Sequence, residues 1–198
     1  MKMQKEETEG IITNLGNIIK SFEDRNILIT GGAGFIGSHL CDVLVYIESR
    51  VYCLDNLSSG NRENIVHLEK NKNFKFIKRD VVGTKNFDGK LDYIIHAASI
   101  ASPDFYQKQP INTLNANTTG TINMLELARK NNCTLLYTST SEVYGDAEII
   151  PTPENYWGNV NPVGIRSCYD EGKRAGEAYC KAYEKQYGID TRIVRIFN

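Results

Sequence analysis

The stretch N-I-L-I-T (26–30), followed directly by G-G-A-G-F-I-G (31–37), decides the fold. The first five residues are a short apolar run typical of a buried strand, and the apolar residues of the following S-H-L-C-D-V-L-V-Y recur at helical spacing. Gly31, Gly34 and Gly37 separate the two patterns. The sequence therefore predicts a strand, a glycine-rich turn and a helix, an order that suits the binding of a dinucleotide.

The same alternation continues along the chain. Further apolar runs that read as buried or half-buried strands lie at 50–55, 74–78, 92–96, 134–138 and 191–196. Helical patterns fall between several of them, and the longest cover 111–131 and 167–187. Strands that alternate with helices predict parallel pairing, and so an α/β fold with a doubly wound, Rossmann-type parallel sheet. Prolines and glycines over 145–166 predict a long loop of the kind that often carries function.

These patterns predict one cofactor-binding domain over residues 25–198. An N-terminal extension, residues 1–24, precedes it and is polar apart from one apolar series. That series fits a short amphipathic helix and consists of Ile11, Ile12, Leu15, Ile18, Ile19 and Phe22. The sequence does not indicate what this extension does.

The composition is that of an ordinary globular protein. The chain has 198 residues, of which 41% are hydrophobic and 24% charged, with a formal net charge of -1. It lacks the basic excess of proteins that bind nucleic acid or anionic membranes, so we expect neither partner. Its five cysteines form no C-x-x-C pair, which favours reduced thiols and no metal site. We see no leader peptide and no membrane-spanning segment, and therefore expect a cytoplasmic protein.

The glycine turn has the context of a cofactor site. Its backbone can approach a pyrophosphate, which the N-terminus of the next helix attracts, so Gly31, Gly34, Phe35, Ile36 and Gly37 are candidate cofactor-binding residues. Asp55 ends the second strand 24 residues after Gly31, where an acidic side chain can bind a ribose diol. It would repel a 2′-phosphate, which favours NAD over NADP. A plain strand-end turn is the alternative interpretation.

Other strand ends should face the same crevice, because ligands of such sheets bind beyond the carboxyl ends of the strands. This argument adds the candidates Asn56, Asp80, Val81, Ala97, Ala98, Ser99 and Thr138. Asp80 could instead be a solvated turn residue. Thr140, Ser141 and Glu142 follow the fifth strand, where serine and threonine also make local backbone bonds without any other function.

Tyr169 and Lys173 lie four residues apart in S-C-Y-D-E-G-K-R (167–174). On a helix this spacing places both side chains on one face, about one turn apart. The spacing alone is common, so the rest of the chain has to give it meaning.

Taken in order, the glycine turn, Asp55 and the tyrosine–lysine pair resemble those of the extended short-chain dehydrogenases/reductases that act on nucleotide sugars. Within this family the chain is most similar to the UDP-glucuronate decarboxylases, also called UDP-xylose synthases. The most specific stretches are S-I-A-S-P-D-F-Y-Q (99–107), N-T-T-G-T-I-N-M-L-E-L-A-R (117–129), T-S-T-S-E-V-Y-G-D (138–146) and Y-W-G-N-V-N-P-V-G-I-R-S-C-Y-D-E-G-K-R (156–174). The resemblance covers residues 26–198.

The resemblance implies roles for the candidate residues. Tyr169 would take the proton of the sugar C4 hydroxyl while a hydride passes to NAD, and Lys173 would bind the nicotinamide ribose and favour the phenolate of Tyr169. Thr140 would bind the same hydroxyl, with Ser141 and Glu142 near the reacting carbons. The 4-keto intermediate would lose CO2, and return of the hydride would give UDP-xylose. The residues expected to bind the UDP-sugar are Thr140, Tyr169 and Asn198.

The resemblance also implies how the chain assembles and how far it extends. Relatives dimerise through the helices expected at 111–131 and 167–187, so we expect a homodimer. They also continue beyond R-I-F-N (195–198) into a region that holds the nucleotide, which suggests a chain truncated before it. This chain has isoleucine where proline is common at Ile100 and Ile165, and Asn115-Ala116 where Lys-Thr is usual. These departures affect the expected contacts to cofactor and substrate.

Two other functions remain open at this point. A nucleotide-sugar 4-epimerase or 4,6-dehydratase would share most of the motifs, although the resemblance argues against both: dehydratases usually have Asp where this chain has Ser141, and epimerases commonly lack a carboxylate at Glu142. A dinucleotide-binding module without catalysis is the third possibility, since fold does not imply function. Such a module would not need Tyr169, Lys173 and Glu142 together.

Overall fold

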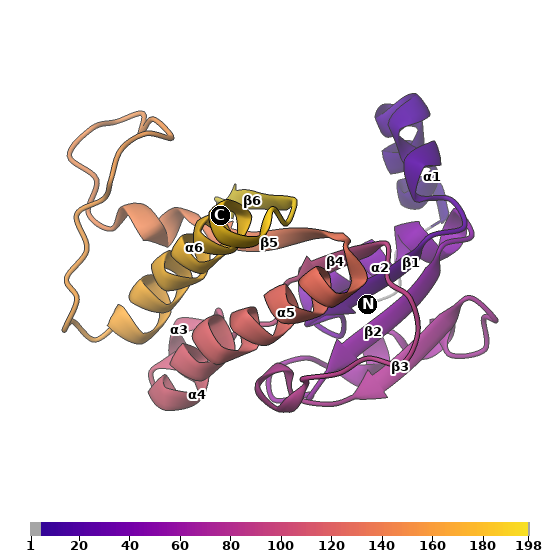
Figure 1. Ribbon diagram of the computed structural model, residues 1–198, viewed down its shortest axis with the longest axis horizontal. Coiled ribbons are helices and arrows are strands. Elements are labelled where there is room, and N and C mark those ends of the chain that lie inside the picture. Colours follow the sequence, from indigo (N-terminus) through magenta and orange to yellow (C-terminus); the bar gives the residue numbers. More distant parts are fainter. Residues whose placement is uncertain (1–4, 198) are drawn as a thin grey trace.

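The computed structural model describes residues 5–197 and contains a six-stranded sheet with the strand order β3-β2-β1-β4-β5-β6 (Figure 1). Every pair of neighbouring strands is parallel. The strands are β1 (Asn26–Thr30), β2 (Arg50–Asp55), β3 (Phe74–Lys78), β4 (Tyr93–His96), β5 (Thr134–Thr140) and β6 (Thr191–Ile196). The predicted Rossmann-type α/β fold is confirmed, and β5 runs two residues further than the pattern indicated.

Helices cover both faces of the sheet. On one face lies α2 (Phe35–Tyr46), and on the other lie α5 (Thr121–Asn131) and α6 (Ser167–Tyr187). The short helices α3 (Pro103–Tyr106) and α4 (Pro110–Asn115) pack on each other, and α4 also packs on α6. Alternate residues of β1 belong to different cores: Leu28 packs into the core that includes residues of α5 and α6, whereas Ile27 and Ile29 pack into the core that includes residues of α2. Both faces of the sheet are therefore apolar, which explains why its strands read as nearly continuous hydrophobic runs.

The helix predicted over 111–131 is interrupted in the structure. A π-helical turn, Ala116–Gly120, separates α4 from α5. Within it the hydroxyl of Thr118 donates to the carbonyl of Leu114 at 2.7 Å, and a Cβ added to Gly120 would lie 2.7 Å from Cγ2 of Val81. Hydroxyl bonds of this kind loosen the regular helical pattern, and the glycine lets the helix approach the segment after β3.

The segment before β1 forms α1 (Lys5–Leu15) and then a 3₁₀ helix, Gly16–Phe22. Ile19 packs against Val43 of α2, whereas Ile18 is largely exposed. Figure 1 shows α1 and the loop after β5 projecting from opposite ends of the molecule. The loop is held at its base by the Gly145–Asn159 bridge.

None of the helices in residues 5–197 is long and apolar enough to cross a membrane. Within the same residues, no group of three His, Cys, Asp or Glu side chains is arranged to hold a metal ion. All five cysteines are free thiols.

Candidate active site

A cleft lies beyond the carboxyl ends of the strands and consists of two cavities that share Gly31, Asp55, Ser59 and Ser99. The larger, of about 670 Å³, is lined among others by Gly31, Gly34, Phe35, Ile36, Gly37, Asp55, Ala97, Ser99, Thr138, Thr140, Glu142, Tyr169 and Lys173. The smaller, of about 220 Å³, is lined among others by Asn56, Asp80, Val81 and Ala98. The candidate residues, separated by up to 142 positions in the sequence, thus meet at one edge of the sheet.

Two candidates are not in this set. Ser141 lines neither cavity, although its neighbours Thr140 and Glu142 line the larger one. Asn198 lies outside the described residues. Among the departures from the family pattern, Ile100, Asn115 and Ala116 line the smaller cavity, and Ile165 is exposed.

The glycine turn brings the backbone close to neighbouring segments. Gly31 has a φ of 69°, and a Cβ there would lie 2.7 Å from the carbonyl oxygen of Ala97, which follows β4. Gly34 precedes the first residue of α2 and has no side chain with which to cap it. The N-terminus of α2 therefore opens toward the cavity without an obstructing side chain, as anion binding requires.

The carboxylate of Asp55 is fixed in place. It accepts backbone N–H bonds from Ala33 at 3.0 Å and from Leu57 at 2.7 Å, and the residue is only 7% exposed. Burial raises the pKa of Asp55, while the two N–H donors act to lower it. The carboxylate is oriented by the glycine turn on one side and by the loop after β2 on the other.

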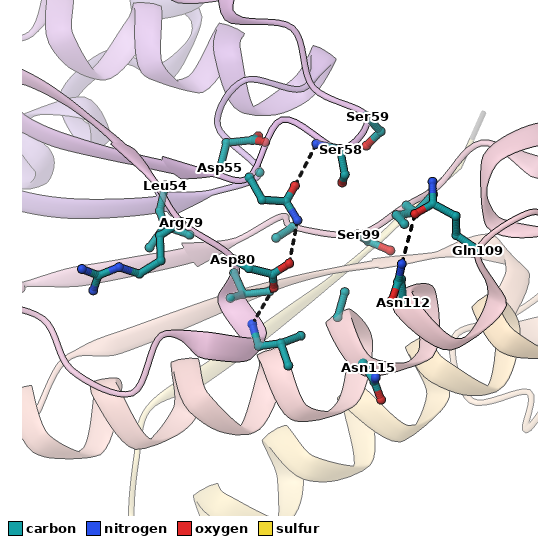
Figure 2. Close-up of a pocket in the computed structure, with 17 residues that line it drawn as sticks. Leu54, Asp55, Ser58, Ser59, Arg79, Asp80, Ser99, Gln109, Asn112 and Asn115 are labelled. Carbon is teal, nitrogen blue, oxygen red and sulfur yellow. Dashed lines mark hydrogen bonds between the residues drawn. The ribbon is translucent and has the colours of Figure 1, made fainter.

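A chain of hydrogen bonds crosses the smaller cavity, as Figure 2 shows. Ser58 N–H donates to Asn56 at 2.9 Å, the Asn56 amide donates to Asp80 at 2.7 Å, and Val82 N–H donates to Asp80 at 2.8 Å. On the facing wall the Asn112 amide donates to Gln109 at 3.1 Å. This arrangement joins the loop after β2 to the segment after β3 and leaves a polar cavity between them.

Several lining residues were not predicted from the sequence. In the smaller cavity they include Ser58, Ser59, Arg79, Gln109 and Asn112. The dipeptide Ser58-Ser59 directly follows the Asp55 loop, so its position offered a signal. No sequence pattern pointed to Gln109 and Asn112, because they reach the smaller cavity only through the turn of the chain between α3 and α4.

Lys173 is deeply buried. The residue is 3% exposed, its Nζ donates to the carbonyl of Thr138 at 2.7 Å, and it lies 4.9 Å from the ring centroid of Tyr137. Burial lowers the pKa of Lys173 to about 7. Burial therefore disfavours the charged ammonium of Lys173 in the free chain.

Tyr169 lies one turn before Lys173 on α6 and is 7% exposed. Burial raises its pKa, the largest effect, and the Thr140 hydroxyl acts in the opposite direction. Removal of the phenol from water thus outweighs the influence of the nearby cation Arg166, and the expected support of the phenolate by Lys173 stays a prediction. The predicted proximity of Tyr169 and Thr140 agrees with the structure.

The ring of Tyr169 stacks on that of Tyr106 from α3, with centroids 5.3 Å apart and planes inclined by 3°. This contact was not anticipated, although Tyr106 lies in one of the stretches that carry the family resemblance. Tyr106 is 1% exposed and fixes one face of the Tyr169 ring. The phenol can move little without disturbing this stack.

The carboxylate of Glu142 is paired with the guanidinium of Arg166, which also lines the larger cavity. The N–H of Glu142 donates to the Thr140 hydroxyl at 3.3 Å. Thr140 and Glu142 are thus linked to each other at the end of β5, and an opposite charge offsets that of Glu142.

The larger cavity thus reaches from the glycine turn to Tyr169. A model of the NAD dependent epimerase/dehydratase family matches residues 27–198. The chain is 51% identical over 174 residues to UDP-glucuronic acid decarboxylase 1 of Danio rerio, covering 88% of this chain and 41% of that protein. It thus spans less than half the length of that relative.

Solved structures of nucleotide-sugar 4-epimerases also superpose on the chain. A UDP-galactose 4-epimerase superposes with a TM-score of 0.73 at 38% identity, covering 86% of this chain and 55% of the other. A UDP-glucose 4-epimerase from Brucella ovis in complex with NAD superposes with a TM-score of 0.72 at 25% identity, covering 88% of this chain and 52% of the other.

Proposed function

The chain belongs to the NAD dependent epimerase/dehydratase family, whose cofactor is NAD, and from this premise we propose that it takes part in the decarboxylation of UDP-glucuronate to UDP-xylose through a 4-keto intermediate. One observation carries the proposal: Tyr169, Lys173 and Glu142 line a single cavity together with the glycine turn. The relative that is 51% identical is itself named a UDP-glucuronic acid decarboxylase, which supports this choice of substrate.

The residues of the cleft fit NAD. Side chains at Gly31 and Gly37 would fill the space against neighbouring backbone, so the turn keeps a cradle open for phosphates. The hydroxyl of Ser99 is buried in the cleft without a hydrogen-bond partner among the described residues, and a ligand can provide one. Asp55 would bind a ribose diol, and Lys173 would bind the second ribose.

When bound, NAD supplies the acceptor and later the donor of one hydride. In our proposal Tyr169 takes the proton of the C4 hydroxyl as the C4 hydrogen leaves as hydride, and the Thr140 hydroxyl orients the same oxygen. The C4 ketone then accepts the electron pair of the C5–C6 bond as CO2 leaves, and the resulting enolate takes a proton from water at C5. Tyr169 finally returns its proton to the C4 oxygen as hydride returns to C4, which regenerates the starting state of both tyrosine and cofactor.

A 4-epimerase is the second candidate, because the similar solved structures include 4-epimerases. Glu142 favours the decarboxylase, since the removal of a hydride at C4 and its return need no further carboxylate beside Tyr169.

The homodimer also remains a prediction. The exposed apolar side chains Ile111 and Leu114 of α4 and Tyr179 of α6 offer a surface for it.

Replacing Asp55 by serine should lower the affinity for NAD by about 10- to 100-fold, because a charged hydrogen-bond acceptor for the ribose is lost. The affinity for NADP should fall less, since the same change removes the repulsion of the 2′-phosphate. Calorimetric titration with both dinucleotides measures this ratio, with the exposed Asp88→Ser variant as the control. An unchanged ratio would show that Asp55 does not select the cofactor.

Replacing Tyr169 by phenylalanine in a full-length version of the protein should lower the rate of UDP-glucuronate turnover by about 10²- to 10⁴-fold, the usual contribution of a positioned acid or base. Affinity for NAD should change little, because the ring and its stack on Tyr106 remain. Release of CO2 measures the rate, and Tyr187→Phe, at an exposed position of the same helix, is the matched control. Equal rates for the Tyr169→Phe variant and the unmodified chain would remove Tyr169 from the role of base.

A further inference from the structure

Glu177 lies one helical turn after Lys173 on α6 and is the centre of a hydrogen-bonded group that the proposed reaction does not use. Its carboxylate accepts the hydroxyl of Ser139 at 2.6 Å. It also accepts two bonds from the guanidinium of Arg195, at 2.9 Å from Nε and 2.7 Å from Nη2. Its side chain is only 14% exposed, so this anion sits among fixed partners rather than in solvent.

Arg195 extends the group to a further element. Its Nη1 donates to the Tyr144 hydroxyl at 2.7 Å and to the Glu154 carbonyl at 2.9 Å, and its guanidinium lies 4.8 Å from the centroid of the Tyr144 ring. The carboxylate of Glu177 thereby links α6 to the ends of β5 and β6, directly beside Thr140. A carboxylate held by these bonds can fix both the geometry and the electrostatics of the neighbouring site.

Few charges face Lys173. Burial lowers its pKa to about 7, and the carboxylate of Glu177 has the largest effect in the opposite direction. The other titratable groups near it are neutral at neutral pH: burial lowers the pKa of His96 on β4 to about 3 and raises those of Tyr137 on β5, Tyr169 on α6 and Cys180 on α6. The guanidinium of Arg195 on β6 is engaged by Glu177 itself.

We propose that Glu177 is a positioning residue for the active site, which keeps Lys173 charged and holds the Ser139–Thr140 end of β5 in place. The proposal rests on the proposed function only for its consequence, since a charged Lys173 binds the cofactor ribose better than a neutral amine. Arg195 in turn orients the carboxylate of Glu177, so that the anion keeps one position relative to Lys173.

A purely structural role is the alternative, in which Glu177 and Arg195 only join α6 to β6. Both roles predict a loss of stability when Glu177 is replaced by glutamine. Only the proposed role predicts that the protonation midpoint of Lys173 moves. The carboxylate of Glu177 opposes the effect of desolvation on the pKa of Lys173, so its removal must move the midpoint to lower pH.

The test follows Lys173 directly, by NMR of the chain labelled with ¹³C at the lysine Cε carbons and titrated from about pH 5 to about pH 9. The Lys173→Met spectrum assigns the signal. We expect the midpoint to fall by about one pH unit in Glu177→Gln. The matched control is Glu184→Gln, which removes another helix carboxylate that bonds a residue of β6, Thr191, and should leave the midpoint unchanged.

An unchanged midpoint in folded Glu177→Gln would overturn the proposal. If that variant does not fold, the double variant Glu177→Gln, Arg195→Gln leaves no charge without its partner, and a smaller fall is expected from it, because a cation farther along the pair is removed with the anion; an unmoved midpoint there also overturns the proposal. Titration of the same samples with NAD tests the proposed function separately from the role of Glu177. A chain that never binds NAD contradicts the proposed function while the midpoint still tests Glu177, and a chain that binds NAD with an unmoved midpoint refutes the role of Glu177 alone.

Discussion

Replacing Gly37 by valine is expected to abolish measurable NAD binding at concentrations that saturate the unmodified chain. Gly37 lies in the first turn of α2, where an added Cβ would overlap the carbonyl oxygen of Gly31 and lie 2.7 Å from the Cα of Gly32. These contacts are backbone atoms of the turn itself, so the turn has to move. Its displacement closes the space that phosphates would occupy at the helix N-terminus.

The same substitution should lower the free energy of unfolding by about 2 kcal/mol, the usual cost of forcing extra atoms into a packed site. Calorimetric titration with NAD and urea denaturation measure the two effects. Gly10→Ala is the control, because a Cβ at Gly10 meets nothing within 4 Å. Normal NAD affinity in the Gly37→Val variant would mean that the turn does not form the cofactor cradle.

Replacing Lys173 by methionine is expected to have opposite effects on binding and stability. NAD affinity and turnover should be lost, because the ammonium that would bind the ribose is gone. The free chain, however, should become more stable by a few kcal/mol, since a buried lysine whose pKa falls from 10.5 to about 7 carries a penalty of roughly 1.4 kcal/mol per pKa unit. Methionine fills similar space without a charge to desolvate.

The stabilisation should depend on pH in a defined sense. The unfolded lysine keeps its proton up to about pH 10, whereas the folded one releases it from about pH 7, so the penalty is complete below the folded pKa and disappears as the pH rises to the unfolded value. The difference in unfolding free energy between Lys173→Met and the unmodified chain should therefore be largest near pH 6 and shrink toward pH 10.

Urea denaturation of both chains across this range measures that difference, and groups that titrate equally in both, such as the buried cysteines, cancel from it. Lys181→Met is the control, because the side chain of Lys181 is exposed on the same helix. A Lys173→Met chain less stable than the unmodified one at pH 6 would contradict the burial of an unfavourable charge.

The sequence indicated the frame of the candidate cofactor site because its signals are local. The glycine turn, Asp55 at the end of β2 and the Tyr169–Lys173 spacing each lie within one element or at its end, and the parallel sheet brings strand ends to one edge. The strand limits were also close to those observed, since both faces of the sheet are apolar and the runs end in polar residues.

What the sequence did not indicate depends on distant contacts. The carboxylate of Glu177 meets Ser139 and Arg195 only after β5, β6 and α6 have packed, and no pattern of spacing predicts that meeting. The stack of Tyr106 on Tyr169 likewise joins residues far apart in the chain. The raised pKa of Tyr169 has the same origin, because burial is a property of the packed structure and no sequence pattern shows it.

The most direct test of the central claim is incubation of a full-length version of the protein with UDP-glucuronate and NAD, followed by mass spectrometry of the nucleotide sugar and by measurement of CO2 and NADH. Our account predicts UDP-xylose and CO2 in equal amounts without net accumulation of NADH, because the hydride taken from C4 returns to it. A 4-epimer of the substrate would identify an epimerase instead. Intact UDP-glucuronate in the presence of bound NAD would contradict the proposed decarboxylation and leave a cofactor-binding module.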